Sequence, residues 1–269
     1  MPSEAKVCRL IAVVLAMLLA ACDDPKPATA TAPSASAPAA PAPKVEETTV
    51  ASAAPSATAP ARAAKRKDPA SCPKDGAVVF EDATLETAVR RQLQKPSGPI
   101  ARADLKKVKT LDLSQASSND ALDPCVFVHL TGLKGLYLAP GDLDDLSPIK
   151  GATALNSLRV SATKVSDLSP LSGMKALDRL DVGRTPVRDL KPLASLTNLT
   201  ELQLDDTEIS DISPLAHLEK LEVLLLKRTR VNDISALKGM RKLKHLYIEG
   251  SLVQDTSPVQ GITGLKVHN

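Results

Sequence analysis

Aspartate recurs at one position of a repeated segment, and it is the residue type in this chain best placed to bind a cation. The column contains Asp145, Asp167, Asp189, Asp211, Asp233 and Asp255. Calcium needs several oxygen ligands that converge on one point, whereas residues repeated on adjacent strands lie about 4.7–4.9 Å apart. Because each copy offers too few oxygens, we predict that the column forms turns and caps. We expect no metal site and no cofactor.

Other chemically reactive side chains do not form a catalytic pattern. The four histidines (129, 217, 245 and 268) are scattered, and the sequence contains no G-x-S-x-G, H-E-x-x-H or phosphate-loop motif. Asp205 and Asp206 are adjacent, so their side chains point in different directions, and no base is near them in sequence. The sequence therefore predicts a protein that is not an enzyme.

The spacing of the leucines indicates the fold that positions these polar side chains. Three apolar series share a step of 22 residues: Leu133 to Leu243, Leu136 to Leu246, and Leu138 to Ile248. An L-x-x-L-x-L core with this period is the signature of a leucine-rich repeat. We predict an α/β fold, a right-handed solenoid of about seven strands. It should have a parallel concave sheet, short helices or 3-10 turns on the convex side, and a helical N-terminal cap.

Polar positions of the repeat have structural interpretations. Ser-Pro pairs, such as Ser213-Pro214, are expected to supply a capping oxygen at the start of each convex turn. Hydroxyls at one slot are expected to bond the backbone of the adjacent turn: Thr163, Thr185, Thr207, Thr229 and Ser251. The string T-x-[VI]-x-D-[LI]-S-P-L closely resembles internalin-type repeats of bacterial surface proteins. This resemblance is specific for the fold and weak for the partner.

Residues 1–21 are predicted to be an export signal. Lys6 and Arg9 precede an apolar run, Leu10 to Leu19, that is too short to remain as a membrane-spanning helix. The end of this run, Leu19-Ala20-Ala21-Cys22, resembles the lipobox of bacterial lipoproteins. This resemblance implies that Cys22 is acylated, for example with palmitate, and anchors the exported chain on the periplasmic or surface side of a bacterial membrane. An ordinary secretory signal with an incidental cysteine is the alternative.

Residues 22–71 are predicted to be a disordered tether. Ala, Pro, Ser and Thr dominate, and no apolar periodicity is present. Near its end, the basic run Arg62 to Lys67 has two interpretations. It either contacts anionic lipid or wall polymer, or it is a solvated linker end.

Residues 72–114 are predicted to form the N-terminal cap and the first strand. Leu85, Val89 and Leu93 make one apolar helical stripe, which Asp82 or Thr84 could cap. A second short helix around 103–108 and a strand at 111–113 follow. The segment resembles the helical cap that precedes internalin-type repeats. The repeats themselves occupy 115–269, with extra residues before Leu136 that should form a bulge or loop.

Two cysteines remain outside the signal and the lipobox. Cys125 stands where later copies have a core-facing leucine, and Cys72 lies in the cap. Outside the cytoplasm the pair could form a disulfide. The alternative is a buried thiol at Cys125 and an exposed, unpaired thiol at Cys72.

The concave sheet is the predicted binding surface, since alternate strand side chains face it. We predict an unidentified protein partner, because exposed tyrosine is a favoured interface anchor. Near the C-terminal end, Val223, Leu225, His245 and Tyr247 should form an apolar patch. The candidate contact residues are Tyr137, Arg159, Arg179, Asp181, Glu201, Gln203, Asp205, Val223, Leu225, Lys227, His245 and Tyr247.

The alternative function is structural or adhesive, with wall polysaccharide or another cell surface as the target. Only two tyrosines are available for stacking on sugars, which favours the protein partner. Lys and Arg total 34 against 31 Asp and Glu, so no broad field for nucleic acid is expected. After the last repeat, a further strand would need an apolar residue at His268. We therefore expect a partly open last turn, or one packed against another copy.

Overall fold

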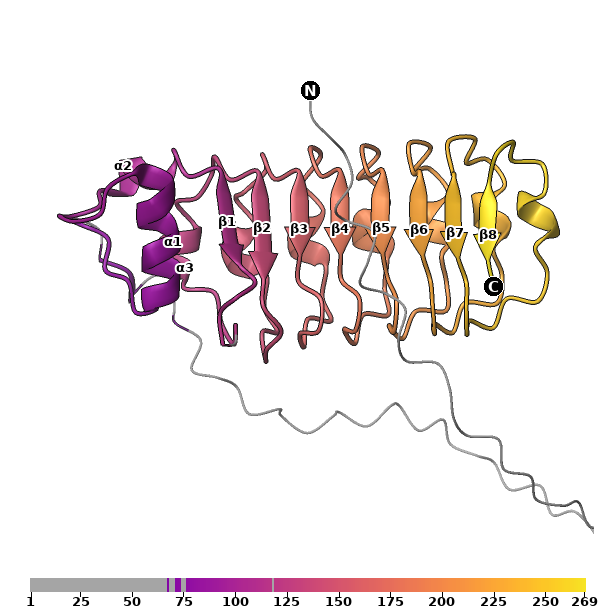
Figure 1. The fold of residues 1–269 in the computed structure, drawn as a ribbon, viewed down its shortest axis with the longest axis horizontal. Coiled ribbons are helices and arrows are strands. Elements are labelled where there is room, and N and C mark those ends of the chain that lie inside the picture. Colours follow the sequence, from indigo (N-terminus) through magenta and orange to yellow (C-terminus); the bar gives the residue numbers. More distant parts are fainter. Residues whose placement is uncertain (1–66, 68–70, 74–75, 118) are drawn as a thin grey trace, which may run out of the picture. The chain divides into compact units, whose positions relative to one another are not determined.

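The computed structural model describes residues 67, 71–73, 76–117 and 119–269 (Figure 1). The predicted export signal, Cys22 and nearly all of the predicted tether lie outside these residues. The described part is a leucine-rich-repeat solenoid with one parallel sheet of eight strands, which follow one another in chain order. The strands are β1 (Thr110–Leu113), β2 (Gly135–Leu138), β3 (Ser157–Arg159), β4 (Arg179–Asp181), β5 (Glu201–Gln203), β6 (Val223–Leu225), β7 (His245–Tyr247) and β8 (Lys266–His268).

The 22-residue step sets the register of the sheet. Leu136 pairs with Leu158 between β2 and β3, and Leu224 pairs with Leu246 between β6 and β7. The leucines of these series are between 0 and 2 % exposed, because every coil turns the same positions inward onto its neighbours. A single coil could not bury both sides of its leucine layer, so stacking is what stabilises the array.

Short 3-10 turns occupy the convex side, and the aspartate column caps them as predicted. In five coils the carboxylate accepts a hydrogen bond from the backbone N–H of the serine two residues later, for example Asp211 from Ser213 at 2.8 Å. The serine therefore begins the turn and does not cap it, contrary to the expectation for Ser-Pro. The turns are η2 (Ser147–Ile149), η3 (Ser169–Leu171), η4 (Lys191–Leu193), η5 (Ser213–Leu215), η6 (Ser235–Leu237) and η7 (Ser257–Val259).

The buried threonine hydroxyls bond within their own coil. Thr207 Oγ1 donates to the carbonyl of Leu204 at 2.6 Å, and Thr163, Thr185 and Thr229 repeat this bond to the carbonyl three residues earlier. The expected ladder between adjacent coils was wrong. The hydroxyl at this slot bonds the carbonyl three residues earlier and so closes the turn of its own coil.

The N-terminal cap is helical. Helix α1 (Ala83–Leu93) begins at Asp82, whose carboxylate accepts hydrogen bonds from the N–H groups of Thr84 and Leu85. Helix α2 (Arg102–Leu105) is shorter than the predicted 103–108 segment and begins one residue earlier. The extra residues before β2 contain helix α3 (Pro124–Phe127), where only a bulge or loop was expected.

Cys72 and Cys125 form a disulfide, with their Cα atoms 5.3 Å apart. The bond joins the cap to α3, and Cys125 is 8 % exposed, close to the buried leucine position that it was predicted to occupy. The disulfide alternative is thus the correct one of the two that the sequence left open.

Strand β8 corrects the prediction for the last turn. Val267 pairs with Leu246, one residue short of the 22-residue step, so that Lys266 and His268 face the open side of the sheet. His268 therefore does not need to be apolar. The eighth strand forms because the sequence Lys-Val-His alternates correctly once the register shifts by one.

Candidate functional site

The twelve predicted contact residues lie in three columns on the open face of the sheet. The buried residue at the centre of each strand, such as Leu224, points inward, and its neighbours Val223 and Leu225 point outward. None of the twelve is fully buried. The face is therefore an array of accessible side chains on a backbone that is fixed by pairing.

A stacked cluster lies at the C-terminal end of this face, which we call the aromatic cluster: Lys227, His245, Tyr247 and His268. The Tyr247 and His268 rings are 4.1 Å apart between centroids, with planes 9° apart. The ammonium nitrogen of Lys227 lies 4.7 Å from the centroid of the Tyr247 ring. His245 Nδ1 is 3.4 Å from His268 Nε2.

Both faces of the Tyr247 ring are occupied by the protein itself. Lys227 follows β6 and His268 belongs to β8, so they approach the ring from the strands on either side of β7. What remains open to a ligand is the edge of the ring and its hydroxyl. Lys227 is further held by Glu249 at 2.6 Å, which raises the pKa of its ammonium group.

Charged residues occupy the centre of the face. Arg159 Nε donates to Asp181 Oδ2 at 3.1 Å, and Gln203 Nε2 donates to Glu201 Oε1 at 2.6 Å. Together with Tyr137 and Arg179, these side chains line a shallow hollow of about 270 Å³. Its paired charged groups can donate hydrogen bonds to a polar partner surface or accept hydrogen bonds from it.

Asp205 and Asp206 have different surroundings. Burial raises the pKa of Asp205, whose Oδ1 accepts a hydrogen bond from the backbone N–H of Lys227 at 2.8 Å. A hydrogen bond from the Arg228 guanidinium lowers the pKa of Asp206, and Arg228 Nη2 lies 2.6 Å from Asp206 Oδ2. Each carboxylate thus has a structural partner in the next coil.

The two tyrosines do not come together. Tyr137 is on β2 and Tyr247 is on β7, five strand spacings away, or about 24 Å. Gly135 lies below the Tyr137 ring, since a Cβ at this glycine would come within 3.3 Å of Tyr137 Cε2. The glycine therefore lets the ring lie flat on the sheet at the opposite end from the aromatic cluster.

Sequence reasoning missed His268 as a member of this face. The missing signal was a one-residue shortening of the last step, which could have been found by testing Val267 in the core position. It also missed a hollow of about 640 Å³ beside the cap, lined by α3 and the loops after β1 and β2. Lys67, at the end of the basic run, lies there, 2.8 Å from Glu81 and 3.6 Å from Asp123.

The residues that the structure describes include neither a metal-ligating cluster nor a membrane-spanning helix. No group of three or more His, Cys, Asp or Glu side chains within them could hold a metal ion. No helix among them is long and apolar enough to span a bilayer.

Solved structures of two internalins from Listeria monocytogenes resemble the chain. An internalin (inlF) aligns with a TM-score of 0.64 and 26 % identity over 70 % of this chain. Internalin C2 (inlC2) aligns with a TM-score of 0.59 and 26 % identity, also over 70 % of this chain and over 93 % of its own length. The alignment covers only 56 % of the inlF chain. No protein-family model and no curated protein matches the sequence. The similarity establishes the internalin-like leucine-rich-repeat fold.

Proposed function

We propose that this chain is an exported, lipid-anchored envelope protein that binds a protein partner through the concave face and catalyses no reaction. The solenoid acts as a rigid display, since each contact residue stands on a strand fixed by two neighbours. Little conformational entropy is then lost by the backbone on binding.

The apolar patch at the C-terminal end of the face, formed by Val223, Leu225, His245 and Tyr247, is the observation that carries this proposal. Val223, Leu225 and Tyr247 are half-buried on the open face, where the fold itself has no need of apolar side chains. Apolar and aromatic residues within a polar surround are typical of the anchors of protein interfaces. The paired charges at the centre of the sheet would form the polar part of the contact.

Polysaccharide binding remains the second candidate, and the geometry favours it less. A sugar ring usually stacks on an open aromatic face, but Lys227 and His268 cover both faces of Tyr247. Tyr137 is about 24 Å away, so the two tyrosines could not stack on the same short oligosaccharide.

A double substitution, Leu225→Ala with Tyr247→Ala, tests the protein-binding proposal. We expect it to abolish partner capture by chemical crosslinking in intact cells, identified by mass spectrometry. The matched control is Leu252→Ala with His217→Ala, two exposed side chains away from the concave face, and it should capture the partner normally. Equal capture by both variants would contradict a role for the C-terminal part of the face.

Anchoring rests on the lipobox-like sequence that ends at Cys22. Replacing the acylated residue, Cys22→Ser, in a chain that carries an ordinary cleavable secretory signal in place of residues 1–21, should move the exported protein from the membrane fraction to the soluble fraction at high salt. It should also abolish incorporation of a labelled fatty acid. Incorporation that persists would show that Cys22 is not the acylated residue.

A further inference from the structure

Charge is segregated between the two rims of the solenoid, although the chain as a whole is nearly neutral. We call one rim the basic rim. It consists of the segments that lead from α2, α3 and the turns η2 to η6 to the next strand: 106–109, 128–134, 150–156, 172–178, 194–200, 216–222 and 238–244. The segments that follow the strands form the acidic rim: 119–123, 139–146, 160–168, 182–190, 204–212, 226–234 and 248–256.

The imbalance is large on both rims. The basic rim carries eleven Lys or Arg against three carboxylates, and the acidic rim carries fourteen carboxylates against six Lys or Arg. The basic side chains are Lys106, Lys107, Lys109, Lys134, Lys150, Lys175, Lys220, Lys238, Arg241, Lys242 and Lys244. All eleven are exposed. Although the total charge of the chain is nearly balanced, its two rims therefore carry opposite net charges.

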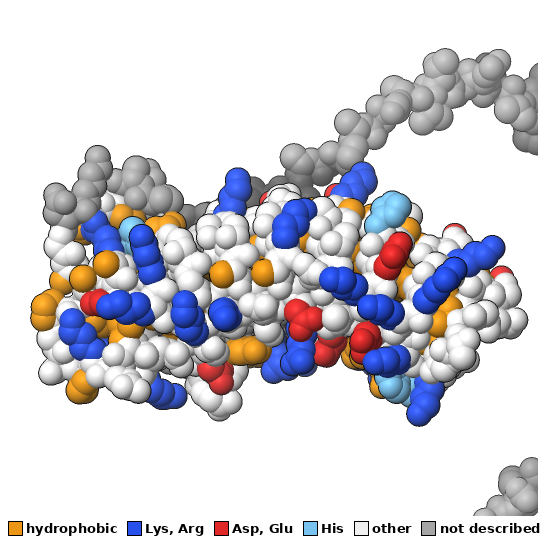
Figure 2. Space-filling model, turned by 90° about the horizontal axis from the view of Figure 1, so that it is seen from above, with side chains coloured by type: hydrophobic (Ala, Val, Ile, Leu, Met, Phe, Trp, Pro, Cys, Tyr) orange, Lys and Arg blue, Asp and Glu red, His pale blue; other side chains and the backbone are white. Residues whose placement is uncertain are grey.

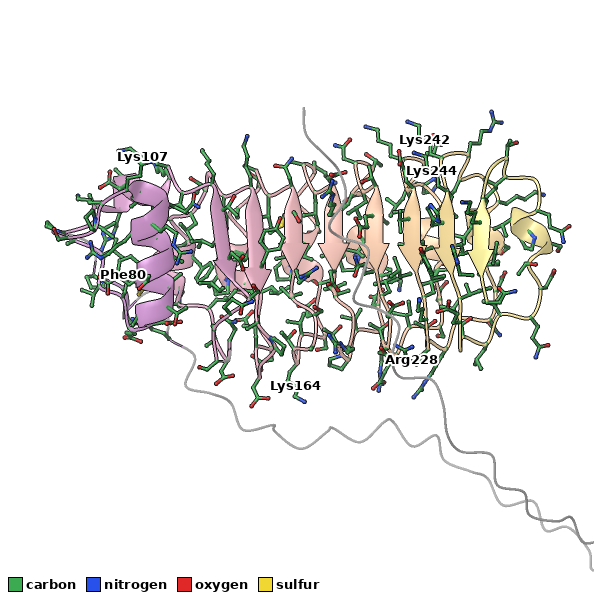
Figure 3. All side chains as sticks on the ribbon, in the orientation of Figure 1. Phe80, Lys107, Lys164, Arg228, Lys242 and Lys244 are labelled. Carbon is green, nitrogen blue, oxygen red and sulfur yellow. A yellow bond between two sulfur atoms is a disulfide. The ribbon has the colours of Figure 1, made fainter. Side chains whose placement is uncertain are left out.

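The figures show the basic rim. Figure 2 looks down on the upper side of Figure 1, where Lys and Arg side chains lie along the whole length, and carboxylates are fewer and gather mainly from the middle toward the C-terminal end. Lys107, Lys242 and Lys244 project from this side in Figure 3, whereas Lys164 and Arg228 lie on the opposite side. Because neighbouring coils are about 4.8 Å apart, the cations form an extended row rather than one pocket, with most of them in the first and last segments and none in 194–200.

Internal pairing does not account for the row. Within the part of the chain that the structure describes, two of the eleven cations lie near carboxylates, Lys107 with Asp104 at 2.8 Å and Lys244 with Glu222 at 2.6 Å. Lys175 donates to the Ser195 carbonyl of the next coil, and Lys220 donates to the Asn198 amide oxygen of the preceding coil. Stability of the fold does not require an excess of eight positive charges along one rim, since exposed charges of one sign repel each other.

The composition of the rim indicates the kind of partner. Ten of the eleven cations are lysine, which acts as a hydrated point charge, whereas arginine is preferred where phosphate is bound in a fixed geometry. The seven segments contain no Tyr, Trp or Phe, so bases of a single-stranded nucleic acid would find no ring to stack on. They also lack the buried aromatic anchors of a protein interface. A diffuse, flexible row of lysines fits a surface that is itself diffuse and negatively charged.

We propose that the basic rim rests on an anionic phospholipid bilayer and holds the solenoid edge-on to the membrane. This inference extends the lipid anchoring proposed above, since an anchored chain stays near such a surface. The acidic rim would then point away from the lipid. The concave sheet lies between the rims, so it would remain open to a protein partner at the side.

Vesicle binding by the mature chain, residues 22–269 with Cys22→Ser and without the apolar export signal, tests the rim without an acyl or apolar anchor. We compare vesicles of phosphatidylcholine alone with vesicles that also contain phosphatidylglycerol, by co-sedimentation at low and high salt. Binding should require phosphatidylglycerol and should weaken as salt screens the charges. Binding of equal strength to both vesicle types would overturn the proposal, because it would come from apolar contact.

Two charge-reversal variants separate the rim from net charge. The basic-rim variant carries Lys134→Glu, Lys150→Glu and Lys242→Glu, and the acidic-rim variant carries Lys164→Glu, Arg184→Glu and Arg230→Glu. All six positions are exposed, and each variant lowers the net charge equally. We expect the basic-rim variant to lose affinity for anionic vesicles by about tenfold or more, and the acidic-rim variant to stay within about twofold of the parent.

Equal losses in the two variants would overturn the proposal, since net charge alone would then explain binding. Circular dichroism verifies folding, and Lys→Gln at the same three basic-rim positions replaces any reversal that unfolds the protein. Failure of this experiment would leave the concave-face proposal intact, because partner capture depends on a different surface.

Discussion

The ring of Tyr247 lies parallel to the imidazole of His268, 4.1 Å away between centroids. This contact exists because β8 pairs one residue out of the regular step, which turns His268 from the expected core position to the open face. The stack is therefore a marker of the shifted register of β8. That register is what places His268 in the aromatic cluster.

Exposure of Tyr247 tests this register. In a Tyr137→Phe background Tyr247 is the only tyrosine of the chain. Removing the stacked ring with His268→Ala should then increase the rate of tyrosine nitration several-fold, because one face of the phenol becomes accessible. An unchanged rate would mean that His268 does not cover Tyr247. His217→Ala, away from the concave face, is the control and should leave the rate unchanged.

The disulfide should stabilise the junction between the cap and the repeats. Replacing both cysteines, Cys72→Ser with Cys125→Ala, removes a link across 53 residues, and we expect the free energy of unfolding to fall by about 2–4 kcal/mol. Urea denaturation monitored by circular dichroism measures the change. The parent should lose similar stability when reductant is added, while the double variant should not respond. A parent that does not respond to reductant would contradict the bond.

Five equivalent residues in successive coils have a left-handed backbone conformation, and this predicts opposite effects for two substitutions. Ala162, Arg184, Asp206 and Arg228 have φ between 54° and 56°, and the equivalent residue of the next coil is Gly250, with φ of 69°. A side chain costs about 1 kcal/mol in this conformation. Ala162→Gly should therefore raise the free energy of unfolding by up to about 1 kcal/mol.

Gly250→Ala is the reciprocal change. It should lower stability by at least as much, because its Cβ would also come within 3.0 Å of Arg228 Cγ. Thermal and urea unfolding of both variants provide the measurement. If the two substitutions shifted stability in the same direction, conformational strain would not be the cause.

Burial of Asp205 predicts a pH dependence. Its pKa is raised in the folded protein, so above the ordinary carboxyl pKa of about 4 the folded state binds more protons than the unfolded state. This group's contribution is therefore fully favourable below that pH and is lost as pH rises through the folded pKa. Asp205→Asn keeps an oxygen for the Lys227 N–H and removes the titration.

Unfolding measured from pH 3 to pH 7 checks this sign. The variant should gain stability relative to the parent as pH increases, and the two should approach each other at low pH. A gap that widens toward low pH would contradict the assignment. Asp206→Asn should behave oppositely, because the Arg228 hydrogen bond lowers the pKa of Asp206.

The repeats could be predicted from the sequence because recurring leucines mark their 22-residue period. Leu158, Leu180 and Leu202 occur in register, and a side chain that recurs every 22 residues must face the same interior. The turn-capping role of Asp211 was predictable for the same reason. The cap was partly predictable, since Leu85 and Val89 share a helical stripe, although α3 and the exact limits of α2 were not.

The features that could not be predicted from the sequence depend on how neighbouring coils are arranged in space. Thr207 was assigned a bond to its neighbouring coil, but its hydroxyl bonds the Leu204 carbonyl within its own coil. His268 was judged by the regular step of 22 residues, whereas β7 and β8 pair with a step of 21 that places Val267 opposite Leu246. Charge segregation between the rims was missed because a total of 34 against 31 says nothing about which side of a coil each charge occupies.

The central claim is that a partner binds the concave face, and site-specific photocrosslinking in intact cells tests it most directly. A photoreactive side chain replaces Gln203 at the centre of the face, and a parallel chain carries it at His217, an exposed residue of the basic rim just after η5 and away from the face. The account predicts that one protein is crosslinked reproducibly from position 203 and not from position 217. Crosslinking of that protein from position 217 alone, or equally from both positions, would contradict it.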